Sequence, residues 1–294
     1  AAPAFLSQGH GNRDVVTKDS PRAAVLGWPV SHSRSPLIHG HWLTSLGLAG
    51  SYDRIAVPPD TADAFFADFR ATGLAGANVT LPHKIRAIGA CDGLSDAARA
   101  IGAVNTLWWD GERLMGDNTD GYGFLANLDQ RLPGWSDAPG TALVLGAGGA
   151  ARAVIYGLST RGFRVVIANR TEARAAELAA QFDGAEACDW ATAMAPGPDV
   201  ALVVNTTSLG MSGNPNLPID LAGLGPASVV TDIVYTPIET GLLKQAAARG
   251  LRTVDGLGML LHQAVPGFER WFGGRPQVSD DLRALVLDNI GQPA

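Results

Sequence analysis

The sequence predicts an α/β protein of two α/β domains, the second of them a doubly wound parallel sheet of the Rossmann type. The chain has 294 residues, which exceeds one average domain. Residues 141–145 form a short apolar run that ends in glycines and leads at once into an alanine-rich, helix-forming segment. From there to residue 254, short apolar runs alternate with helical segments, a pattern typical of a parallel sheet covered by helices.

The run at 141–145, the glycine turn and the helix expected at 149–159 together predict a dinucleotide-binding unit. Gly146 makes the turn, Gly148 lets a pyrophosphate approach the backbone, and Ala151 takes the small third position. Free N–H groups and the helix dipole then face an anion. A strand-to-helix turn without a ligand is the alternative, because a lone glycine pattern is weak evidence.

The strands that follow predict which dinucleotide binds. We expect them at 164–168, 200–205, 228–233 and 251–254, with helices at 172–182 and 239–249. The strand at 164–168 ends in Asn169, Arg170 and Thr171. An NAD site usually places an acidic residue there for the ribose 2′-OH, whereas Arg accommodates the 2′-phosphate of NADP. This turn therefore favours NADP, with an ordinary exposed arginine as the alternative.

The first half of the chain also alternates strands and helices. Strands are expected at 23–27, 52–57, 76–79, 104–109 and 113–116, the last two as a hairpin, with helices after residue 58, at 95–101 and at 122–131. Pro36 suits the first turn of a helix that runs to about Leu46, with Ser35 as its cap. Capping does not explain Ser33. Recognition of a ligand by the Ser33 and Ser35 hydroxyls is therefore the alternative to capping.

Lys84 is unusual for this chain. The chain has three lysines, Lys18, Lys84 and Lys244, and the other nineteen of its 22 basic residues are arginines. Of the two residue types, Lys is the one whose proton can move at useful pH, because burial lowers its pKa while Arg stays charged. A solvated lysine that opens a helix is the alternative. Asp120, in the polar turn 116–121, is either a helix cap or part of a site.

Hydride transfer between an alcohol and a nicotinamide also moves the hydroxyl proton, so the protein must supply an acid/base group. A zinc alcohol dehydrogenase needs a Cys/His ligand set, which this sequence lacks, so we expect no metal. Short-chain reductases use a Tyr and a Lys four positions apart, and no tyrosine here has that neighbour. Lys84 paired with Asp120 remains: an ionised Asp keeps the Lys charged as proton donor to a carbonyl.

Composition narrows the partners further. Net charge is −6 and basic residues form no run, which argues against nucleic acid or an anionic membrane and favours a small molecule. Cys91 and Cys188 lie far apart, as expected for a reducing cytoplasm. No apolar run approaches the roughly 20 residues of a membrane span. Residues 1–21 lack the apolar core of a signal peptide and are expected to form a loosely attached extension.

The sequence as a whole closely resembles the shikimate dehydrogenase family (shikimate/quinate dehydrogenases). Nine stretches in family order, spread over about residues 22–263, carry the resemblance: GWPVSHSRSP, NVTLPHK, GAVNT, GDNTDGYGF, VLGAGGAARA, ANRT, VNTTSLGM, DIVYTPIET and DGLGMLLHQA. It implies reversible, NADPH-dependent reduction of 3-dehydroshikimate to shikimate, a step of aromatic amino acid biosynthesis. It also implies a substrate domain of residues 22–119 and 256–294, around an NADP domain of residues 120–255.

Carried over residue by residue, the resemblance implies Lys84 and Asp120 as the catalytic pair. The substrate shell would comprise Ser33, Ser35, Thr80, Asn105, Tyr235 and Gln263. The cofactor positions would be Gly146, Ala147, Gly148, Gly149, Ala150, Asn169, Arg170, Thr171, Ile233, Gly256 and Met259, with Asp96 as a weaker carry-over.

Two departures from the family pattern bear on the substrate entrance. His83 stands where Phe is common, and Gly40 where Asn is frequent. Both hydroxyl positions are serines, whereas relatives that act on the bulkier quinate often carry Thr at the second, so the resemblance implies a preference for shikimate. The alternatives are a broader quinate/shikimate dehydrogenase that uses NAD or NADP, and a non-catalytic ligand sensor on the same fold. As to assembly, we expect a monomer or a homodimer.

Overall fold

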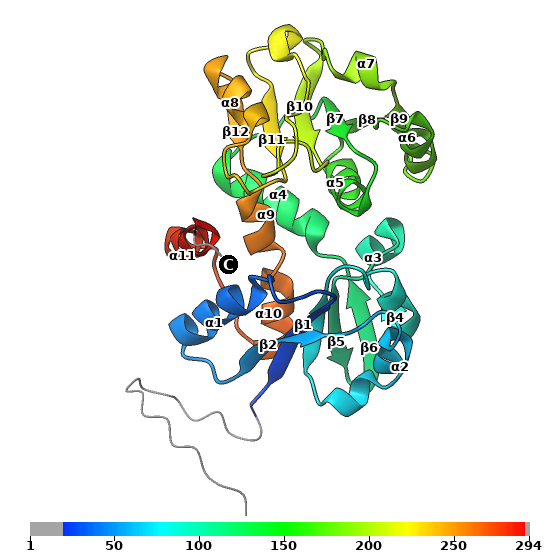
Figure 1. Ribbon diagram of the computed structural model, residues 1–294, viewed down its shortest axis with the longest axis vertical. Helices are drawn as coiled ribbons and strands as arrows, with labels where there is room; N and C mark the ends of the chain where they lie inside the picture. Colours follow the sequence, from blue (N-terminus) through cyan, green and yellow to red (C-terminus); the bar gives the residue numbers. More distant parts are fainter. Residues whose placement is uncertain (1–19, 292–294) are drawn as a thin grey trace, which may run out of the picture.

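The computed structural model describes residues 20–291 and arranges them around two separate six-stranded sheets (Figure 1). Nearly all of the extension expected at 1–21 lies outside the described residues. The first lobe, the sheet of β1–β6 with the helices that cover it, is built mainly from the first half of the chain. The second lobe, the sheet of β7–β12 with its helices, follows. None of the helices between residues 20 and 291 is long and apolar enough to cross a membrane.

The first sheet is mixed, with strand order β2-β1-β3-β5-β6-β4. Its centre is parallel, since β1 pairs with β2 on one side and β3 on the other. The strands β5 and β6 form the hairpin that the Asp110-Gly111 turn predicts. In addition, β5 pairs antiparallel with β3. The strand bounds are β1 Arg22–Gly27, β2 Ser51–Ala56, β3 Gly76–Val79, β4 Gly93–Leu94, β5 Thr106–Asp110 and β6 Arg113–Asp117.

Two helix predictions in the first lobe need correction. The helix α1, Ser35–Leu46, begins with Ser35 already inside it, and Arg34 holds the capping position without a side-chain cap bond. Ser35 therefore does not cap the helix. The helix expected after residue 58 is only α2, Ala62–Ala67, because a 3₁₀ turn at Phe69–Thr72 replaces its continuation. The lobe also contains α3, Asp96–Ile101, capped by Ser95, and a 3₁₀ helix at Arg86–Ala90.

The second sheet is parallel throughout, with order β12-β11-β10-β7-β8-β9, and confirms the doubly wound prediction. The order reverses between β7 and β10, and the carboxyl edge at such a point is where these sheets bind ligands. Its strands are β7 Thr141–Leu145, β8 Arg164–Ala168, β9 Ala185–Ala187, β10 Val200–Asn205, β11 Val229–Asp232 and β12 Arg252–Val254. Its helices are α5 Gly149–Thr160, α6 Glu172–Ala179, α7 Trp190–Ala193 and α8 Gly241–Ala248, with a 3₁₀ turn at Leu221–Gly223.

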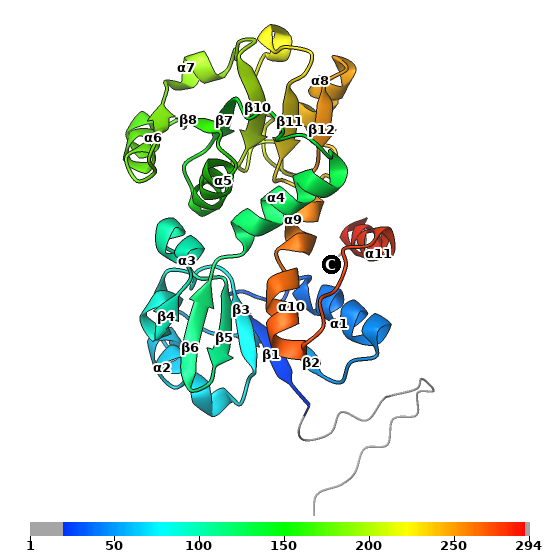
Figure 2. The ribbon, with the colours of Figure 1, turned by 180° about the vertical axis from the view of Figure 1, so that it is seen from behind.

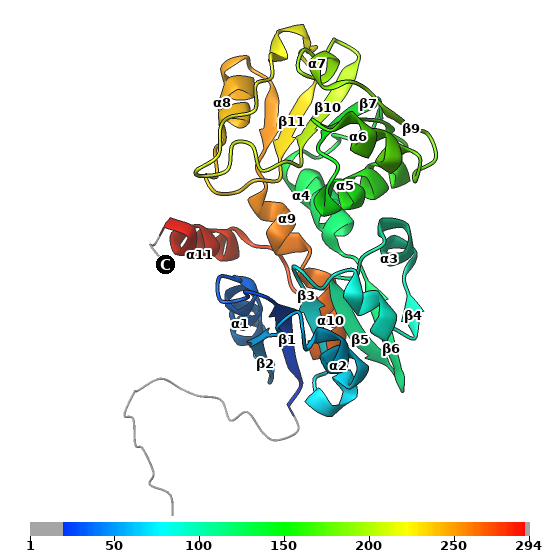
Figure 3. The same cartoon turned by 45° about the vertical axis from the view of Figure 1, so that its right-hand side comes forward.

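Two helices lie side by side between the lobes, α4 (Asp120–Arg131) and α9 (Leu257–His262) (Figures 1 and 3). After α9 the chain returns to the first lobe, where α10 (Val265–Phe272) packs on β3 and β5 and Trp271 Nε1 donates to the Leu107 carbonyl at 2.9 Å (Figure 2). The last helix, α11 (Asp280–Gly291), lies against α1. This return agrees with the fold that the family resemblance implies.

The apolar residues after Met259 predict one helix that includes Gln263 and runs to about Phe272, and this prediction is wrong. The helix α9 ends at His262 and α10 starts at Val265, so Gln263 lies in a break. Pro266 explains the break, because it has no N–H to donate to the carbonyl of His262 and its ring clashes with a continuous helix at that point. The break lets Gln263 stand beside the polar turn that precedes α4.

Candidate active site

A cavity of about 350 Å³ lies at the carboxyl ends of β1 and β3, where both lobes contribute residues. Its walls bring together most of the site residues that the sequence predicts. From the first lobe come Ser33, Ser35, Thr80, Lys84 and Asn105; from α4, the second lobe and the segment after β12 come Asp120, Ile233, Tyr235, Gly256, Met259 and Gln263.

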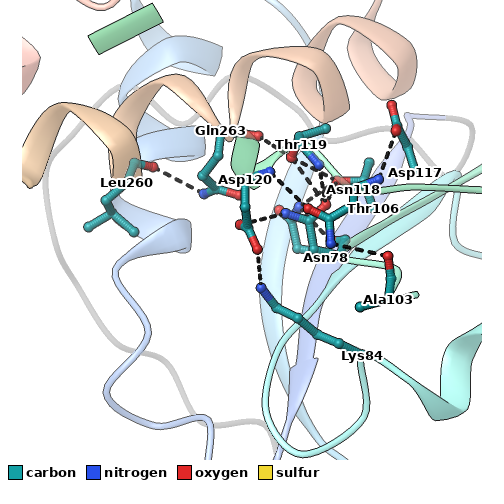
Figure 4. A network of polar contacts seen from close by, with 11 residues as sticks. Asn78, Lys84, Ala103, Thr106, Asp117, Asn118, Thr119, Asp120, Leu260 and Gln263 are labelled. Atoms are coloured by element: carbon teal, nitrogen blue, oxygen red, sulfur yellow. Dashed lines mark hydrogen bonds and ion pairs between the residues drawn. The ribbon is translucent and has the colours of Figure 1, made fainter. Parts of the chain in front are cut away.

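The Lys84 ammonium and the Asp120 carboxylate form an ion pair within this cavity, with 2.6 Å between Nζ and Oδ2 (Figure 4). The Lys84 side chain is 27% exposed and that of Asp120 is 16% exposed. The pair is therefore largely shielded from solvent but still accessible to a ligand in the cavity. Asn105 Nδ2 donates to the other oxygen, Oδ1, at 2.8 Å. Because an ammonium has three donors, two remain for a ligand. The arrangement can hold and transfer a proton next to a bound carbonyl.

Asn105 is itself held in one orientation. Its Oδ1 accepts hydrogen bonds from the Thr119 N–H and the Thr106 hydroxyl, both at 2.9 Å. These donors fix the amide so that its NH₂ points at Asp120. The Thr119 hydroxyl in turn lies 2.8 Å from the Gln263 carbonyl (Figure 4). The break between α9 and α10 is therefore tied directly to the turn that carries Asp120.

Ser33 lies on the loop before α1, and Ser35 is the first residue of that helix. Ser33 Oγ is 3.2 Å from Ser35 Oγ and accepts a bond from the Ser35 N–H. Arg54, on β2, donates twice to the Ser33 carbonyl, at 3.0 and 2.6 Å, and so anchors the loop. The loop and the start of α1 thus present a pair of hydroxyls to the cavity, as hydroxyl recognition requires.

Asn78, on β3, is a cavity residue that the sequence analysis missed. Its Oδ1 accepts the Tyr52 hydroxyl at 2.6 Å, and its Nδ2 donates to the Asn105 carbonyl at 3.2 Å and to Thr106 Oγ1 at 3.3 Å. These bonds connect the floor of the cavity to Asn105. The available signal was its place in an otherwise apolar strand, since a buried amide needs partners.

Neither buried histidine of the first lobe lines the cavity. His39 stacks on Tyr52 with ring centroids 3.9 Å apart, and burial lowers its pKa to about 3. His83 is also buried and has its Nε2 2.7 Å from the Val57 carbonyl. The presence of His83 where the family commonly has Phe therefore affects the core next to Phe66 rather than the substrate entrance.

The glycine turn forms part of a second cavity, of about 210 Å³, with Asn169 and Arg170 on its wall. Gly146 has φ +110°, and a Cβ there would come within 2.6 Å of Thr206 Oγ1, so both conformation and space require glycine. The N–H groups that open α5 and the Arg170 guanidinium suit a pyrophosphate and a 2′-phosphate. These residues fit NADP.

A third cavity, of about 380 Å³, adjoins the first two, since it shares Ile233 and Tyr235 with one and Thr206–Ser208 with the other. Together, the linings of the three cavities extend from the glycine turn to Lys84. The loop 206–208, absent from the predicted cofactor positions, lines two of them.

Four predicted cofactor residues line none of these cavities: Gly149, Ala150, Thr171 and Asp96. Gly149 and Ala150 begin α5 next to the turn, and the Thr171 carbonyl accepts a bond from Asn169 Nδ2 at 3.0 Å. Asp96 is exposed in the first turn of α3, 3.6 Å from Arg99. The structure thus places three of them beside the cofactor cavity and gives Asp96 an ion pair within its own helix. Within residues 20–291, no three His, Cys, Asp or Glu side chains are grouped to hold a metal.

Comparisons with known proteins agree with this geometry. Three family models match the chain: the shikimate dehydrogenase substrate binding domain at residues 25–107, shikimate/quinate 5-dehydrogenase at 130–208, and the shikimate 5′-dehydrogenase C-terminal domain at 256–285.

Individual relatives cover nearly the whole chain. The shikimate dehydrogenase (NADP⁺) of Azorhizobium caulinodans is 56% identical over 92% of this chain and 96% of its own length. The shikimate dehydrogenase (NADP⁺) of Methylocella silvestris is 56% identical over 92% of this chain and 97% of its own length. The crystal structure of shikimate 5-dehydrogenase from Thermus thermophilus with NADP(H) and shikimate matches with a TM-score of 0.80 at 38% identity, over 90% of this chain and 98% of that one. The chain belongs to the shikimate dehydrogenase family.

Proposed function

We propose that this protein catalyses the reversible, NADP-dependent reduction of 3-dehydroshikimate to shikimate. The observation that carries the proposal is the Lys84–Asp120 ion pair in a cavity, with adjoining cavities that extend to the glycine turn. When bound, NADPH supplies the hydride to the carbonyl carbon of the substrate. The protein must then give a proton to the carbonyl oxygen, and Lys84 is the cavity's donor for it.

Each side chain has a defined part in this proposal. Lys84 Nζ donates a proton to the oxygen that becomes the hydroxyl, and in the reverse direction the neutral amine takes it back. Asp120 and Asn105 orient the Lys84 ammonium, and the Asp120 charge stabilises it. Ser33 and Ser35 bind the polar groups of the substrate at the far wall, while Thr80, Tyr235 and Gln263 complete the cavity.

Arg170 supports the choice of NADP. Its guanidinium lines the cavity beside the glycine turn, where a carboxylate would otherwise bind a ribose 2′-OH. Relatives that share more than half of their residues with this chain carry NADP⁺ in their names. We also propose the division into a substrate domain of residues 22–119 plus 256–294 and a cofactor domain of residues 120–255, with the two connections at Asp120 and Gly256 acting as hinges.

The test is a four-way comparison of initial rates, with shikimate or quinate as the alcohol and NADP or NAD as the acceptor, followed at the reduced-nicotinamide absorbance. We expect rapid reduction with shikimate and NADP only. A larger kcat/KM for quinate or for NAD would replace the proposal by the broader quinate/shikimate dehydrogenase. Absence of turnover in all four mixtures would favour a ligand sensor. Light scattering of the eluted protein decides between a monomer and a homodimer.

A further inference from the structure

A carboxylate is buried outside the cavities, at the carboxyl end of the second sheet. Asp232 is the last residue of β11, its side chain is fully buried, and its register partner on β10 is Asn205. No Lys or Arg of residues 20–291 forms an ion pair with it. Burial raises its pKa, although three hydrogen bonds partly oppose that shift. A buried carboxylate without an ion-pair partner is costly to keep unless hydrogen bonds compensate for the lost hydration.

The carboxylate accepts hydrogen bonds from three different segments. Asn205 Nδ2 and the Val234 N–H both donate to Oδ1, each at 3.0 Å. The Thr240 hydroxyl donates to Oδ2 at 2.7 Å, and Thr240 also caps α8. Asp232 therefore joins the end of β10, the loop that follows β11 and the start of α8.

Asn205 also forms hydrogen bonds with the loop that follows β10. Its Oδ1 accepts from the Thr207 N–H at 3.0 Å and from the Thr207 hydroxyl at 2.7 Å, and its Nδ2 also donates to the Leu209 carbonyl at 3.0 Å. The Asn205 amide thus holds the loop 206–210 through three hydrogen bonds, and a fourth joins it to the Asp232 carboxylate. Without the carboxylate, the amide has no fixed acceptor for its second N–H.

The two loops held in this way form different parts of the site. Residues 206–208 line the cavity at the glycine turn, whereas Ile233 and Tyr235 line the cavity that contains Lys84. The same segment abuts the connection between the lobes, because a Cβ at Gly256 would come within 2.3 Å of the Ile233 carbonyl oxygen. The spacing between the cofactor wall and the substrate wall therefore depends on what joins these loops.

We propose that Asp232 is a positioning residue, which fixes the loop 206–210 and the loop 233–236 relative to each other so that cofactor and substrate are held at the correct separation. Asp232 lines none of the three cavities and acts only through Asn205, Val234 and Thr240. The inference rests on the proposed function for its kinetic consequence, and on the hydrogen bonds alone for its structural one.

The test compares the wild type with Asp232→Ala, Asp232→Asn and a control, Ser228→Ala. Ser228 lies at the opposite end of the same strand pair, is buried, and donates to the Val200 carbonyl at 2.7 Å. The control therefore removes a buried bond between the same segments at the edge that faces away from the site. Asp232→Asn keeps the side-chain volume and can still accept a hydrogen bond from the Val234 N–H. This variant keeps the proposal testable if Asp232→Ala does not fold.

We expect Asp232→Ala to raise KM for NADP and for shikimate, each by about tenfold or more, because both walls lose their common anchor. Asp232→Asn should recover most of this loss, and Ser228→Ala should leave both KM values within about twofold of the wild type. Unchanged KM values in Asp232→Ala, or an equal rise in Ser228→Ala, would overturn the proposal.

Amide hydrogen exchange without any ligand keeps this inference separate from the proposed function. Exchange in peptides that cover 206–210 and 233–236 should accelerate in Asp232→Ala and not in Ser228→Ala. If the wild type turns over neither substrate but these two loops still loosen together, the proposed function is wrong and the positioning role stands. If exchange in these loops matches the wild type, the positioning role is wrong whatever the activity.

Discussion

Lys84 and Asp120 stand 36 positions apart in the chain, yet Lys84 Nζ lies 2.6 Å from Asp120 Oδ2. The two residues just before β5 support both partners: the Val104 N–H donates to the Lys84 carbonyl at 2.8 Å, and Asn105 Nδ2 donates to Asp120 Oδ1. The segment that enters β5 thus fixes the backbone of one partner and the side chain of the other. In the proposed mechanism, proton transfer at this site needs both members of the pair.

Lys84→Ala should lower kcat for shikimate oxidation by about 10²-fold or more while KM changes little, because the variant loses the proton acceptor and keeps the walls of the cavity. Lys244→Ala is the matched control, since Lys244 is exposed on α8. Steady-state rates with NADP measure both. A Lys84→Ala enzyme that retains wild-type kcat would assign the proton transfer to another group.

Arg170→Ala should raise KM for NADP by about tenfold or more and leave KM for NAD nearly unchanged, because only NADP has a 2′-phosphate for the guanidinium. Arg164→Ala serves as control: Arg164 begins the strand that Arg170 follows, and it pairs with Glu186 at 2.6 Å. If the two variants lose the same share of NADP affinity, the effect is one of net charge and not of a 2′-phosphate site.

Tyr52→Phe should lower the free energy of unfolding by about 1–3 kcal/mol, because Asn78 Oδ1 then loses its buried donor. The stacking on His39 is kept, since the ring remains. Tyr156→Phe, which removes a half-buried hydroxyl with no hydrogen bond among residues 20–291, should change stability by less than about 0.5 kcal/mol. Urea unfolding curves compare the two. Equal effects would mean that the Tyr52 hydroxyl contributes nothing through Asn78.

His39 should make the protein less stable as the pH falls below 6.5. Burial lowers its pKa to about 3, so in this window the unfolded chain binds a proton that the native protein excludes. The free energy of unfolding then decreases with falling pH by at most about 1.4 kcal/mol per pH unit from this residue.

His39→Phe should remove that contribution, because Phe keeps an aromatic ring next to Trp42, Tyr52 and Phe268 and does not titrate. His262, whose pKa burial lowers to about 4, acts equally in both proteins. Urea unfolding at pH 7 and pH 5 measures the difference, which should be smaller in His39→Phe. An unchanged difference between the two pH values would contradict a neutral, buried His39.

Most strands of the second sheet are predictable because they are short, largely buried apolar runs. Thr141–Leu145 and Arg164–Ala168 were predicted with their observed bounds. The strand β9, Ala185–Ala187, was missed because it is a short edge strand with exposed residues, which leaves no apolar pattern. Local propensity also failed near Gln263, where Pro266 divides what apolar spacing suggests is one helix.

The sequence alone determined the order of strands and helices in the second lobe, the glycine turn and the residue types of the site, because these follow from local chain chemistry: apolar periodicity, a small residue where a turn needs it, and an arginine in place of an acid. Family-specific motifs then related these residues to one another. The tertiary structure decided what no local pattern contains. It placed Lys84 against Asp120, Asn78 under Asn105, and Asp232 between two loops, because such contacts depend on which strands become neighbours in a sheet. Hydrogen bonds between side chains that are distant in the chain exist only once packing has brought their partners together.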